Sequence, residues 1–329
     1  MGDHVDIEAV PERWERVEPF SIANFTWTAI EPLVVTARRD GAFGRGEGMP
    51  IFYRPGESAK KLADQVRAAA SRAQLSRAAL GDLLPANGAR NALDCALWDL
   101  ESKLAGQPVW RLASLPEPRP VLTVQTIGLA APGVMAEKAA DLSADFPLLK
   151  LKLGAAGDLE RVEAVRRACP KARLVVDANT GWTLDTLNAL ASPLRDLGVE
   201  FIEQPLPPER NADLDLYEGP LPLCADESCQ DLASLDELEG RFAYVNIKLD
   251  KTGGLTDALH LARAAQGRGF RLMVGNMIGT SLAMAPAYFL ALLCDYADLD
   301  GAFGLARDRE PPLTCLGGYV HPPSRDLWG

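Results

Sequence analysis

Between residues 123 and 301 the chain repeats one pattern, a short apolar run followed in most cases by a helix-like amphipathic stretch. Strands that alternate with helices are joined by right-handed crossovers and form a parallel sheet. Eight such strands predict a closed (β/α)8 barrel of the TIM type. An open doubly wound sheet would need a glycine-rich dinucleotide loop after its first strand, and TIGLAAPG is not one. The runs begin at Thr123, Leu148, Ala172, Val199, Leu221, Tyr244, Arg271 and Tyr296.

The residues before these runs follow a different pattern. Between residues 14 and 43, β-branched and aromatic residues indicate strands, with a turn at Asp40-Gly41. Amphipathic stretches that begin at Glu57 and Asn91 predict two helices. Strands followed by helices indicate a separate α+β domain. We therefore predict an α+β domain over residues 1–115, a barrel over 116–302 and a C-terminal segment over 303–329.

Charge and composition limit the partners and the chemistry. The chain has 34 Lys and Arg against 45 Asp and Glu, a net charge of −11, so neither nucleic acid nor an anionic membrane is expected as a partner. No signal peptide is recognised at the N-terminus, glycines and a proline interrupt the apolar stretch 272–294, and the six Cys include no C-x-x-C pair. A cytoplasmic protein is expected. With only three His, its chemistry is expected on carboxylates and lysines.

Three carboxylates end neighbouring runs, at the edge where barrel enzymes place their active sites. These are Asp177, Glu203 and Asp226. Any one of them is compatible with an ordinary turn, as Asp177 would be before Asn179. Together, however, three carboxylates repel one another unless a cation compensates them. Oxygen ligands suit a hard ion that keeps open positions, so the sequence predicts a Mg²⁺ site.

Three lysines also lie at strand ends. Lys150 and Lys152 alternate with leucines, so their side chains point to the same face of the second strand. Paired ammonium groups and burial both lower a lysine pKa, which would supply a neutral amine as a base. Lys248 ends the sixth run, across the ring from the second. One base on each side of a metal-bound carbon acid is what a racemase or epimerase requires, with an enediolate between the two proton transfers.

The ends of the runs carry five motifs: KLKLG at Lys150, VVDAN at Val175, IEQPL at Ile202, ADES at Ala225 and NIKLDKTGGLTDAL at Asn246. These motifs resemble those of the enolase superfamily, within it the muconate-lactonizing-enzyme branch. The final run, YADLDG at Tyr296, adds a D-x-D element similar to that of dipeptide epimerases, especially L-Ala-D/L-Glu epimerases. Active sites of that superfamily combine a Lys or His base with Mg²⁺, and the residue types at these strand ends match that combination.

The resemblance implies a role for each of these residues. It implies that the N-terminal domain caps the barrel, that the C-terminal segment packs back on the cap, and that one Mg²⁺ is bound per subunit. Lys152 and Lys248 become the acid/base pair, and Lys150 polarises the substrate carboxylate and lowers the pKa of Lys152. Asp298 and Asp300 are expected to hold the ammonium group of a small dipeptide. The Mg²⁺ ligands are Asp177, Glu203 and Asp226, and the further substrate-binding residues are Asn276 and Ile278.

One position departs from the glutamate-selective relatives. Where they carry an arginine in the early capping loop, this chain has Asn24, followed by Phe25 and Trp27. A neutral amide cannot make the charge-assisted contact of an arginine. Either Arg54 in the following loop supplies the cation, or the second residue of the dipeptide is more apolar than Glu.

The expected activity is epimerisation at the α-carbon of the C-terminal residue of an L-Ala-X dipeptide, either L-Ala-D/L-Glu or a more apolar one. The alternative is a lyase or cycloisomerase on the same scaffold, such as o-succinylbenzoate synthase or muconate cycloisomerase, which needs no ammonium anchor. Lys248 as a Schiff-base lysine of an aldolase, or a barrel that only binds ligands, are weaker alternatives. The sequence leaves the preferred dipeptide and a homo-oligomeric state open.

Overall fold

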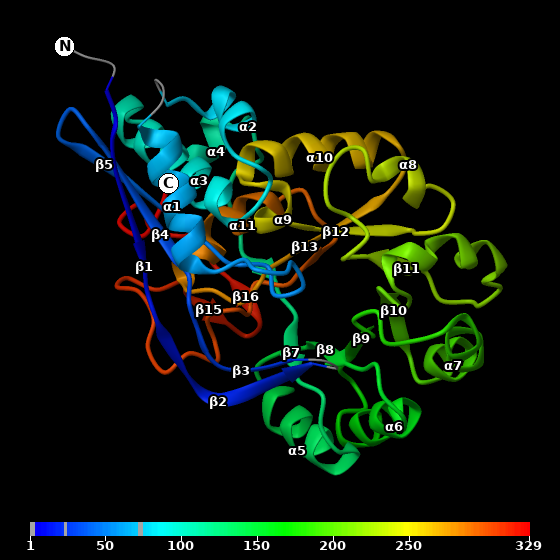
Figure 1. Ribbon diagram of the computed structural model, residues 1–329. Coiled ribbons are helices and arrows are strands. Elements are labelled where there is room, and N and C mark those ends of the chain that lie inside the picture. The colour runs from blue at the N-terminus through cyan, green and yellow to red at the C-terminus, as the bar shows by residue number, and fades with distance from the viewer. Residues whose placement is uncertain (1–3, 23–24, 72–74) are drawn as a thin grey trace.

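The computed structural model describes residues 4–22, 25–71 and 75–329. The N-terminal domain holds two antiparallel sheets, one in the order β1-β4-β5 and one made of β2 and β3 (Figure 1). The strands are β1 (Asp6–Pro11), β2 (Trp14–Ile22), β3 (Phe25–Ile30), β4 (Leu33–Arg39) and β5 (Ala42–Gly48). The helices are α1 (Ala59–Ala70), the short 3-10 helix η1 (Arg77–Ala79), α2 (Leu80–Leu83), α3 (Gly88–Ala105) and α4 (Val109–Leu112).

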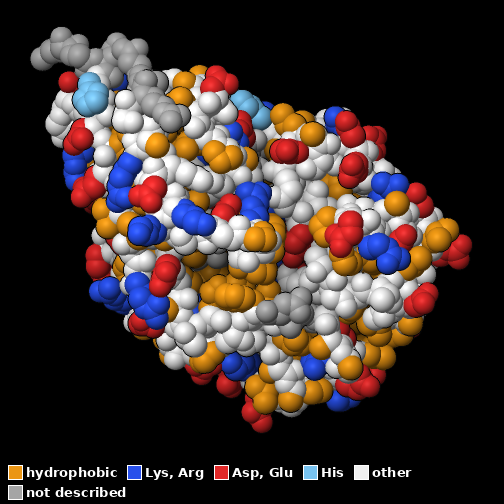
Figure 2. Space-filling model, in the orientation of Figure 1, with side chains coloured by type: hydrophobic (Ala, Val, Ile, Leu, Met, Phe, Trp, Pro, Cys, Tyr) orange, Lys and Arg blue, Asp and Glu red, His pale blue; other side chains and the backbone are white. Residues whose placement is uncertain are grey.

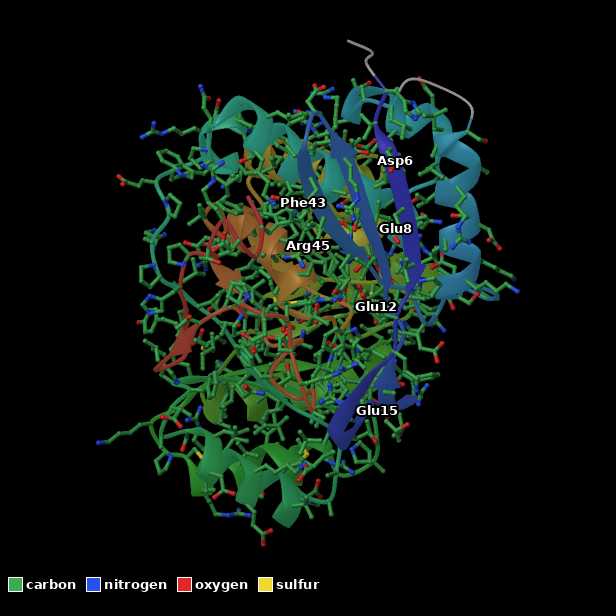
Figure 3. All side chains as sticks on the ribbon, turned by 90° about the vertical axis from the view of Figure 1, so that its left-hand side faces the viewer. Asp6, Glu8, Glu12, Glu15, Phe43 and Arg45 are labelled. Atoms are coloured by element: carbon green, nitrogen blue, oxygen red, sulfur yellow. The ribbon has the colours of Figure 1, made fainter. Side chains whose placement is uncertain are left out.

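Helix α3 packs directly on β5 because that strand carries glycine at alternate positions. A Cβ atom at Gly44, Gly46 or Gly48 would lie 2.2, 2.1 or 1.9 Å from the α3 backbone. The opposite face of β5 presents its larger side chains, among them Phe43 and Arg45 (Figure 3). Helix α3 therefore covers one face of β5, and the opposite face of the strand can pack against other parts of the chain.

The predicted turn and helices of this domain are present. Asp40 and Gly41 both have positive φ, 50° and 78°, and join β4 to β5 as a tight hairpin. Helix α3 begins at Gly88, before the predicted start at Asn91, because the Asn87 side chain accepts hydrogen bonds from the first turn. It ends where Gly106 adopts the left-handed conformation.

The second part of the chain confirms the parallel barrel. The eight-stranded sheet follows sequence order from β7 to β14, and every strand pair in it is parallel. A parallel bridge between Thr123 and Ala297 joins its two ends, and the Val124 amide donates to the Ala297 carbonyl at 2.8 Å. The strands are β7 (Gln125–Ile127), β8 (Leu148–Lys152), β9 (Arg173–Asp177), β10 (Val199–Glu203), β11 (Leu223–Ala225), β12 (Tyr244–Lys248), β13 (Arg271–Gly275) and β14 (Tyr296–Ala297).

Helices cover the outside of this barrel (Figure 1). The apolar stretch 272–294 consists of strand β13 followed by helix α11, as the sequence predicted. No helix of the described residues is long and apolar enough to cross a membrane. The helices are α5 (Pro132–Leu142), α6 (Asp158–Ala168), α7 (Leu184–Asp196), the 3-10 helix η2 (Pro208–Leu216), α8 (Leu235–Leu238), α9 (Leu249–Thr252), α10 (Leu255–Gly267) and α11 (Ser281–Ala291).

The interior of the barrel is filled at the amino ends of the strands by one buried apolar cluster. Because side chains alternate along a strand, the residues two and four positions further on share the interior face at the carboxyl ends. After Leu148 these are Lys150 and Lys152, and after Val175 comes Asp177. Apolar side chains therefore fill the barrel at the amino ends of its strands, and the polar side chains line its mouth at the carboxyl ends. The cluster consists of Val124, Leu148, Val175, Phe201, Cys224, Tyr244, Met273 and Tyr296.

The C-terminal segment runs back from the barrel to the N-terminal domain. Strands β15 (Cys315–Leu316) and β16 (Tyr319–Val320) form a small antiparallel sheet with β6 (Val121–Leu122). Trp328 is fully buried and donates from Nε1 to the Cys95 carbonyl of α3 at 3.1 Å. Arg45 donates to the Leu327 carbonyl at 3.1 Å. These contacts tie the end of the chain to helix α3 and strand β5.

A buried polar cluster, which we call the clasp, joins β5 to the barrel. Glu47 is fully buried and accepts hydrogen bonds from the amide and hydroxyl of Thr280, the residue that caps α11. Arg309 lies 2.8 Å from both Glu47 and Glu12. Because these residues come from three distant parts of the sequence, the clasp holds the N-terminal domain over the mouth of the barrel.

Candidate active site

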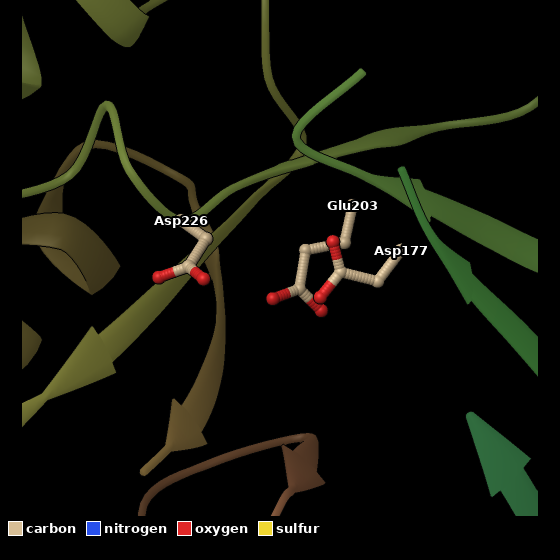
Figure 4. A group of neighbouring side chains, drawn as sticks. All are labelled: Asp177, Glu203 and Asp226. Atoms are coloured by element: carbon tan, nitrogen blue, oxygen red, sulfur yellow. The ribbon is translucent and has the colours of Figure 1, made fainter. Parts of the chain in front are cut away.

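The three predicted carboxylates meet at the mouth of the barrel. Asp177 and Glu203 are the last residues of β9 and β10, and Asp226 directly follows β11 (Figure 4). One carboxylate oxygen from each lies within 4.8 Å of the others, and all three side chains are buried. Successive parallel strands bring residues about 25 positions apart in sequence to one rim, which is why the spacing predicted this cluster.

The electrostatics of the cluster fit a bound cation. Burial and the neighbouring charge of Asp177 raise the pKa of Glu203 to about 7. Glu203 Oε1 accepts from the Asn246 amide at 2.8 Å, but its buried Oε2 accepts no hydrogen bond of normal geometry. Burial alone would raise the pKa of Asp177, yet the ammonium groups of Lys152 and Lys150 lower it to about 2. Three buried carboxylates that offer only oxygen donors suit a hard divalent ion such as Mg²⁺.

Two of the lysines approach the cluster from different sides. Lys152 Nζ, from β8, lies 2.6 Å from Asp177 Oδ2, and Lys248 Nζ, from β12, lies 2.7 Å from Asp226 Oδ2. Strands β8 and β12 are separated by β9, β10 and β11 in the sheet. The two amines therefore stand on opposite sides of the space above the carboxylates.

Lys150 sits deeper and is surrounded by negative charge. Its Nζ lies 2.8 Å from Glu203, 3.0 Å from Asp298 and 3.2 Å from Asp177. Burial by itself would lower the pKa of Lys150, but these carboxylates raise it well above its ordinary value. The expectation that burial and pairing with Lys152 lower the pKa is therefore wrong for Lys150, because three carboxylates outweigh one neighbouring ammonium group. Lys150 is a fixed positive charge.

The D-x-D element lies where the barrel closes. Asp298 accepts from the Asn276 amide at 3.0 Å as well as from Lys150, and Asp300 accepts from the backbone amide of Thr126 at 2.6 Å. Burial and the charge of Asp298 raise the pKa of Asp300 to about 7. Asp300 has no side-chain cation among its hydrogen-bond partners in the described part of the chain. Its carboxylate is thus available to a positively charged ligand.

A cavity of about 280 Å³ lies beside the three lysines and the acidic pair, Asp298 and Asp300. Its lining includes Lys150, Lys152, Lys248 and both members of that pair. A second, apolar cavity of about 50 Å³ adjoins it and shares Lys152, Lys248, Asn276 and Ile278. Phe20 also lines both cavities, and the apolar cavity is otherwise lined by Ile22, Trp27, Phe52, Asn179, Glu227 and Met277.

Aromatic side chains from the β2–β3 hairpin and the loop after β5 form one side of the apolar cavity. The rings of Phe25 and Trp27 are 4.5 Å apart, and those of Trp27 and Phe52 are 5.2 Å apart. Phe25 and Phe52 are 44% and 38% exposed. Figure 2 shows apolar side chains gathered in the central hollow of this face. Aromatic surface that is left exposed beside a cavity is typical of a ligand-binding site.

The remaining predicted residues fall in different places. Asn276 and Ile278 line both cavities, and the Ile278 amide donates to Asn276 Oδ1 at 2.7 Å. Asn24 lies outside the described residues. Arg54 lines neither cavity, because its guanidinium donates to the Ala86 carbonyl and to Gln230. The cation that a glutamate side chain would need is therefore not supplied by Arg54 in this arrangement.

Three residues of the site were not predicted. Lys251 Nζ is fully buried and lies 2.7 Å from Asp226 Oδ1, while Gln204 Oε1 accepts from the Asp226 amide at 2.9 Å. Asn246 holds Glu203. The alternation of side chains along β12 would have indicated Asn246, which shares the face of Lys248. Gln204 and Lys251 gave no such signal, since they lie just after their strands, where that alternation ends.

The chain belongs to the mandelate racemase / muconate lactonizing enzyme family. Residues 4–113 match the N-terminal domain of that family, and residues 134–326 match its enolase C-terminal domain-like part. The chain is 42% identical over 318 residues to the L-Ala-D/L-Glu epimerase of Escherichia coli K12, covering 96% of this chain and 99% of the relative.

Two solved structures extend the similarity. An enolase family member from Agrobacterium tumefaciens with homology to dipeptide epimerases, solved with sodium and L-Ala-L-Glu, is 42% identical, with a TM-score of 0.95 over 99% of this chain and 100% of that one. A dipeptide epimerase from Enterococcus faecalis, complexed with Mg and L-Leu-L-Tyr, is 27% identical, with a TM-score of 0.89 over 98% and 97% of the two chains.

Proposed function

We propose that this protein is a Mg²⁺-dependent dipeptide epimerase that inverts the α-carbon of the C-terminal residue. The observation that carries the proposal is the placement of Lys152 and Lys248 on opposite sides of one cavity, above a carboxylate cluster that fits a metal ion. Inversion requires a proton to leave one face of a carbon and return to the other, and two opposed amines supply both positions.

Asp177, Glu203 and Asp226 would hold the metal ion. When bound there, Mg²⁺ supplies positive charge that stabilises the substrate carboxylate as negative charge builds up on it. Lys150 adds a fixed ammonium group beside the carboxylates of the proposed metal ligands. It is proposed to attract the substrate carboxylate toward the metal site. Asn246, Gln204 and Lys251 hold the ligands in place, since each donates to or accepts from Glu203 or Asp226.

The two lysines share the proton transfer. Either one removes the α-proton from its own side of the substrate in neutral form, and the other, as an ammonium group, donates a proton from the opposite side. The carbon between the two steps is planar and carries its charge into the carboxylate as an enediolate. The reverse reaction exchanges the two roles, so the same site serves both epimers.

The acidic pair, Asp298 and Asp300, sets the orientation in which the dipeptide binds. Asp300, at the far end of the cavity, is proposed to bind the free ammonium group of the dipeptide together with Asp298. With the ammonium group there and the reacting carbon between the lysines, the side chain on that carbon points to the apolar cavity. Six of its lining residues are apolar. An apolar C-terminal residue is therefore proposed in preference to Glu.

Hydrogen exchange in D₂O tests the proposal. With Mg²⁺, L-Ala-L-Leu should exchange its leucine α-hydrogen and yield the epimer. Lys152→Met and Lys248→Met should each abolish epimerisation but retain exchange for one configuration, and the retained configuration should differ between the two variants. A single base would instead lose exchange of both configurations in one variant and neither in the other.

The lyase alternative gives a different result in the same assay. Substrates of o-succinylbenzoate synthase or muconate cycloisomerase carry no ammonium group, so Asp300→Asn should not affect their conversion. For a dipeptide epimerase the same substitution should raise the KM for dipeptides. Turnover of such ammonium-free substrates together with no exchange in any dipeptide would replace the epimerase proposal with the lyase one.

A further inference from the structure

The cavity of the active site continues past the acidic pair. Beyond Asp298 and Asp300 it opens into a wider cavity of about 550 Å³ that runs between the β2–β3 hairpin and helix α5. Arg16, Phe20, Gln125, Thr126, Leu142, Phe303 and Gly304 line both cavities. If the substrate ammonium group binds the acidic pair, the side chain of the N-terminal residue extends toward this shared region. Arg16 is the cation of that region.

The backbone fixes the position of Arg16. Strand β2 is joined to the segment after Asp300 by two hydrogen bonds, from the Val17 amide to the Gly304 carbonyl at 3.0 Å and from the Ala306 amide to the Glu15 carbonyl at 2.8 Å. A Cβ atom at residue 304 would lie 2.1 Å from Arg16 Nη2. The guanidinium thus lies directly against the backbone of Gly304. It also lies 5.3 Å from the centre of the Phe20 ring.

Arg16 has no carboxylate partner in the described part of the chain. Its Nε donates to the Glu18 carbonyl at 3.2 Å, and no acidic side chain of the described residues forms an ion pair with either terminal nitrogen. Burial lowers the pKa of this half-buried arginine, and the charge of Asp300 offsets part of that effect. A partly desolvated guanidinium beside a cavity is favourable for a planar anion, which it can bind through two parallel hydrogen bonds.

The other charges of the region do not compete for this role. Lys138, in the wider cavity, is paired with Glu18 at 2.8 Å. Asp141 lines only the wider cavity and is exposed to solvent. In the cavity of the active site the three lysines are each within 3.0 Å of a carboxylate. Among the described groups that line that cavity, Arg16 and Asp300 are therefore one cation and one anion that form no ion pair with another described side chain.

We propose that Arg16 binds the side-chain carboxylate of an acidic N-terminal residue, so that the enzyme prefers L-Glu-X or L-Asp-X dipeptides to their neutral counterparts. This inference rests on the proposed function, since it uses the acidic pair as the ammonium site. An N-terminal Glu or Asp carries both charges on one residue, an ammonium group for Asp300 and a carboxylate for Arg16. Phe20 and Phe303 contact the methylene groups between them.

The test compares matched dipeptides in the D₂O exchange assay. L-Glu-L-Leu and L-Gln-L-Leu differ in one charged group and have nearly the same shape. The kcat/KM ratio of the first to the second should be about tenfold or more, the size of one charge-assisted contact, and should arise in KM. Arg16→Gln should bring the ratio to about 1, and Arg16→Lys, which keeps the charge but not the fork, should restore part of it.

Lys138→Gln is the matched control, because it removes a nearby positive charge that is already paired with Glu18. This variant should leave the kcat/KM ratio of L-Glu-L-Leu to L-Gln-L-Leu unchanged. If the ratio falls as much as in Arg16→Gln, the overall positive potential of the region and not Arg16 selects the substrate, and the inference is overturned. A wild-type ratio near 1 with exchange of both dipeptides refutes the Arg16 role alone. Faster exchange of N-succinyl-L-Leu, which keeps a carboxylate but has no ammonium group, than of L-Glu-L-Leu would refute the acidic pair as the ammonium site, and with it the inference that uses that site. Absence of exchange in every dipeptide refutes the proposed function itself.

Discussion

Replacing Arg309 by Met should destabilise the protein in a way that depends on pH. Arg309 is the cationic partner of Glu47 in the clasp, and Glu47 is fully buried, with Thr280 as its remaining hydrogen-bond donor. Without Arg309 the carboxylate must either stay charged in a low-dielectric environment or take up a proton. Breaking a buried ion pair by removal of one partner costs about 3–5 kcal/mol.

Protonation sets an upper limit on this cost. A glutamate with an ordinary pKa of about 4.3 requires about 1.4 kcal/mol per pH unit to become protonated, which is about 5 kcal/mol at pH 8 and about 1.6 kcal/mol at pH 5.5. Burial already raises the pKa of Glu47 in the intact clasp, and Arg309 opposes that effect. Because the folded-state pKa then lies above the unfolded-state value, the variant loses stability as the pH rises.

Urea denaturation at the two pH values measures the effect. The difference in unfolding free energy between wild type and Arg309→Met should be about 3–5 kcal/mol at pH 8 and no more than about 2 kcal/mol at pH 5.5. Arg307→Met is the matched control, since Arg307 also packs on Trp14, at 4.8 Å against 4.5 Å for Arg309, and it forms no ion pair among the described residues. Adding Glu47→Gln to Arg309→Met should recover stability at pH 8. An equal loss at both pH values would refute the argument.

Three further outcomes are expected. Asp300→Asn should raise the dipeptide KM by about 10- to 100-fold with a smaller change in kcat, because it removes a charged contact to the substrate; steady-state epimerisation kinetics measure this. Dialysis against EDTA should abolish α-hydrogen exchange and added Mg²⁺ should restore it, whereas full exchange without metal would contradict the role of Asp177, Glu203 and Asp226. Trp328→Ala should lower the unfolding free energy by about 3–5 kcal/mol in urea titrations, because it empties a fully buried site against Phe289.

The barrel and its rim were predictable because their signals are local and repeated. Alternating side chains place Lys150 and Lys152 on one face, and the regular spacing of the runs places Asp177 and its neighbours on one rim. Each such inference needs only one strand and the general geometry of a parallel barrel.

The parts that were not predictable depend on contacts between distant segments. Arg16 lines the active-site cavity only because β2 pairs with residues that follow the last barrel strand. Arg54 was a candidate for substrate binding, but Ala86 and Gln230, far from it in sequence, bind its guanidinium. The high pKa of Lys150 likewise follows from Glu203 together with Asp298, which is 148 residues away and reaches Lys150 only when the barrel is closed.

The barrel closes between Thr123 and Ala297, and this closure separates the residues proposed for the reaction from those proposed for substrate selection. The proposed metal ligands lie on β9, β10 and the end of β11, one contiguous stretch, and need no contact across the closure. The acidic pair forms only after the last strand has reached the first, since Asp300 is held by the Thr126 amide. Substitutions in the segment that follows Asp300, or in β2 which pairs with it, can therefore change which molecule is selected while the residues assigned to the reaction stay intact. Among proteins with this fold, the preferred substrate can therefore change through substitutions that leave the metal ligands and the two acid/base lysines unchanged.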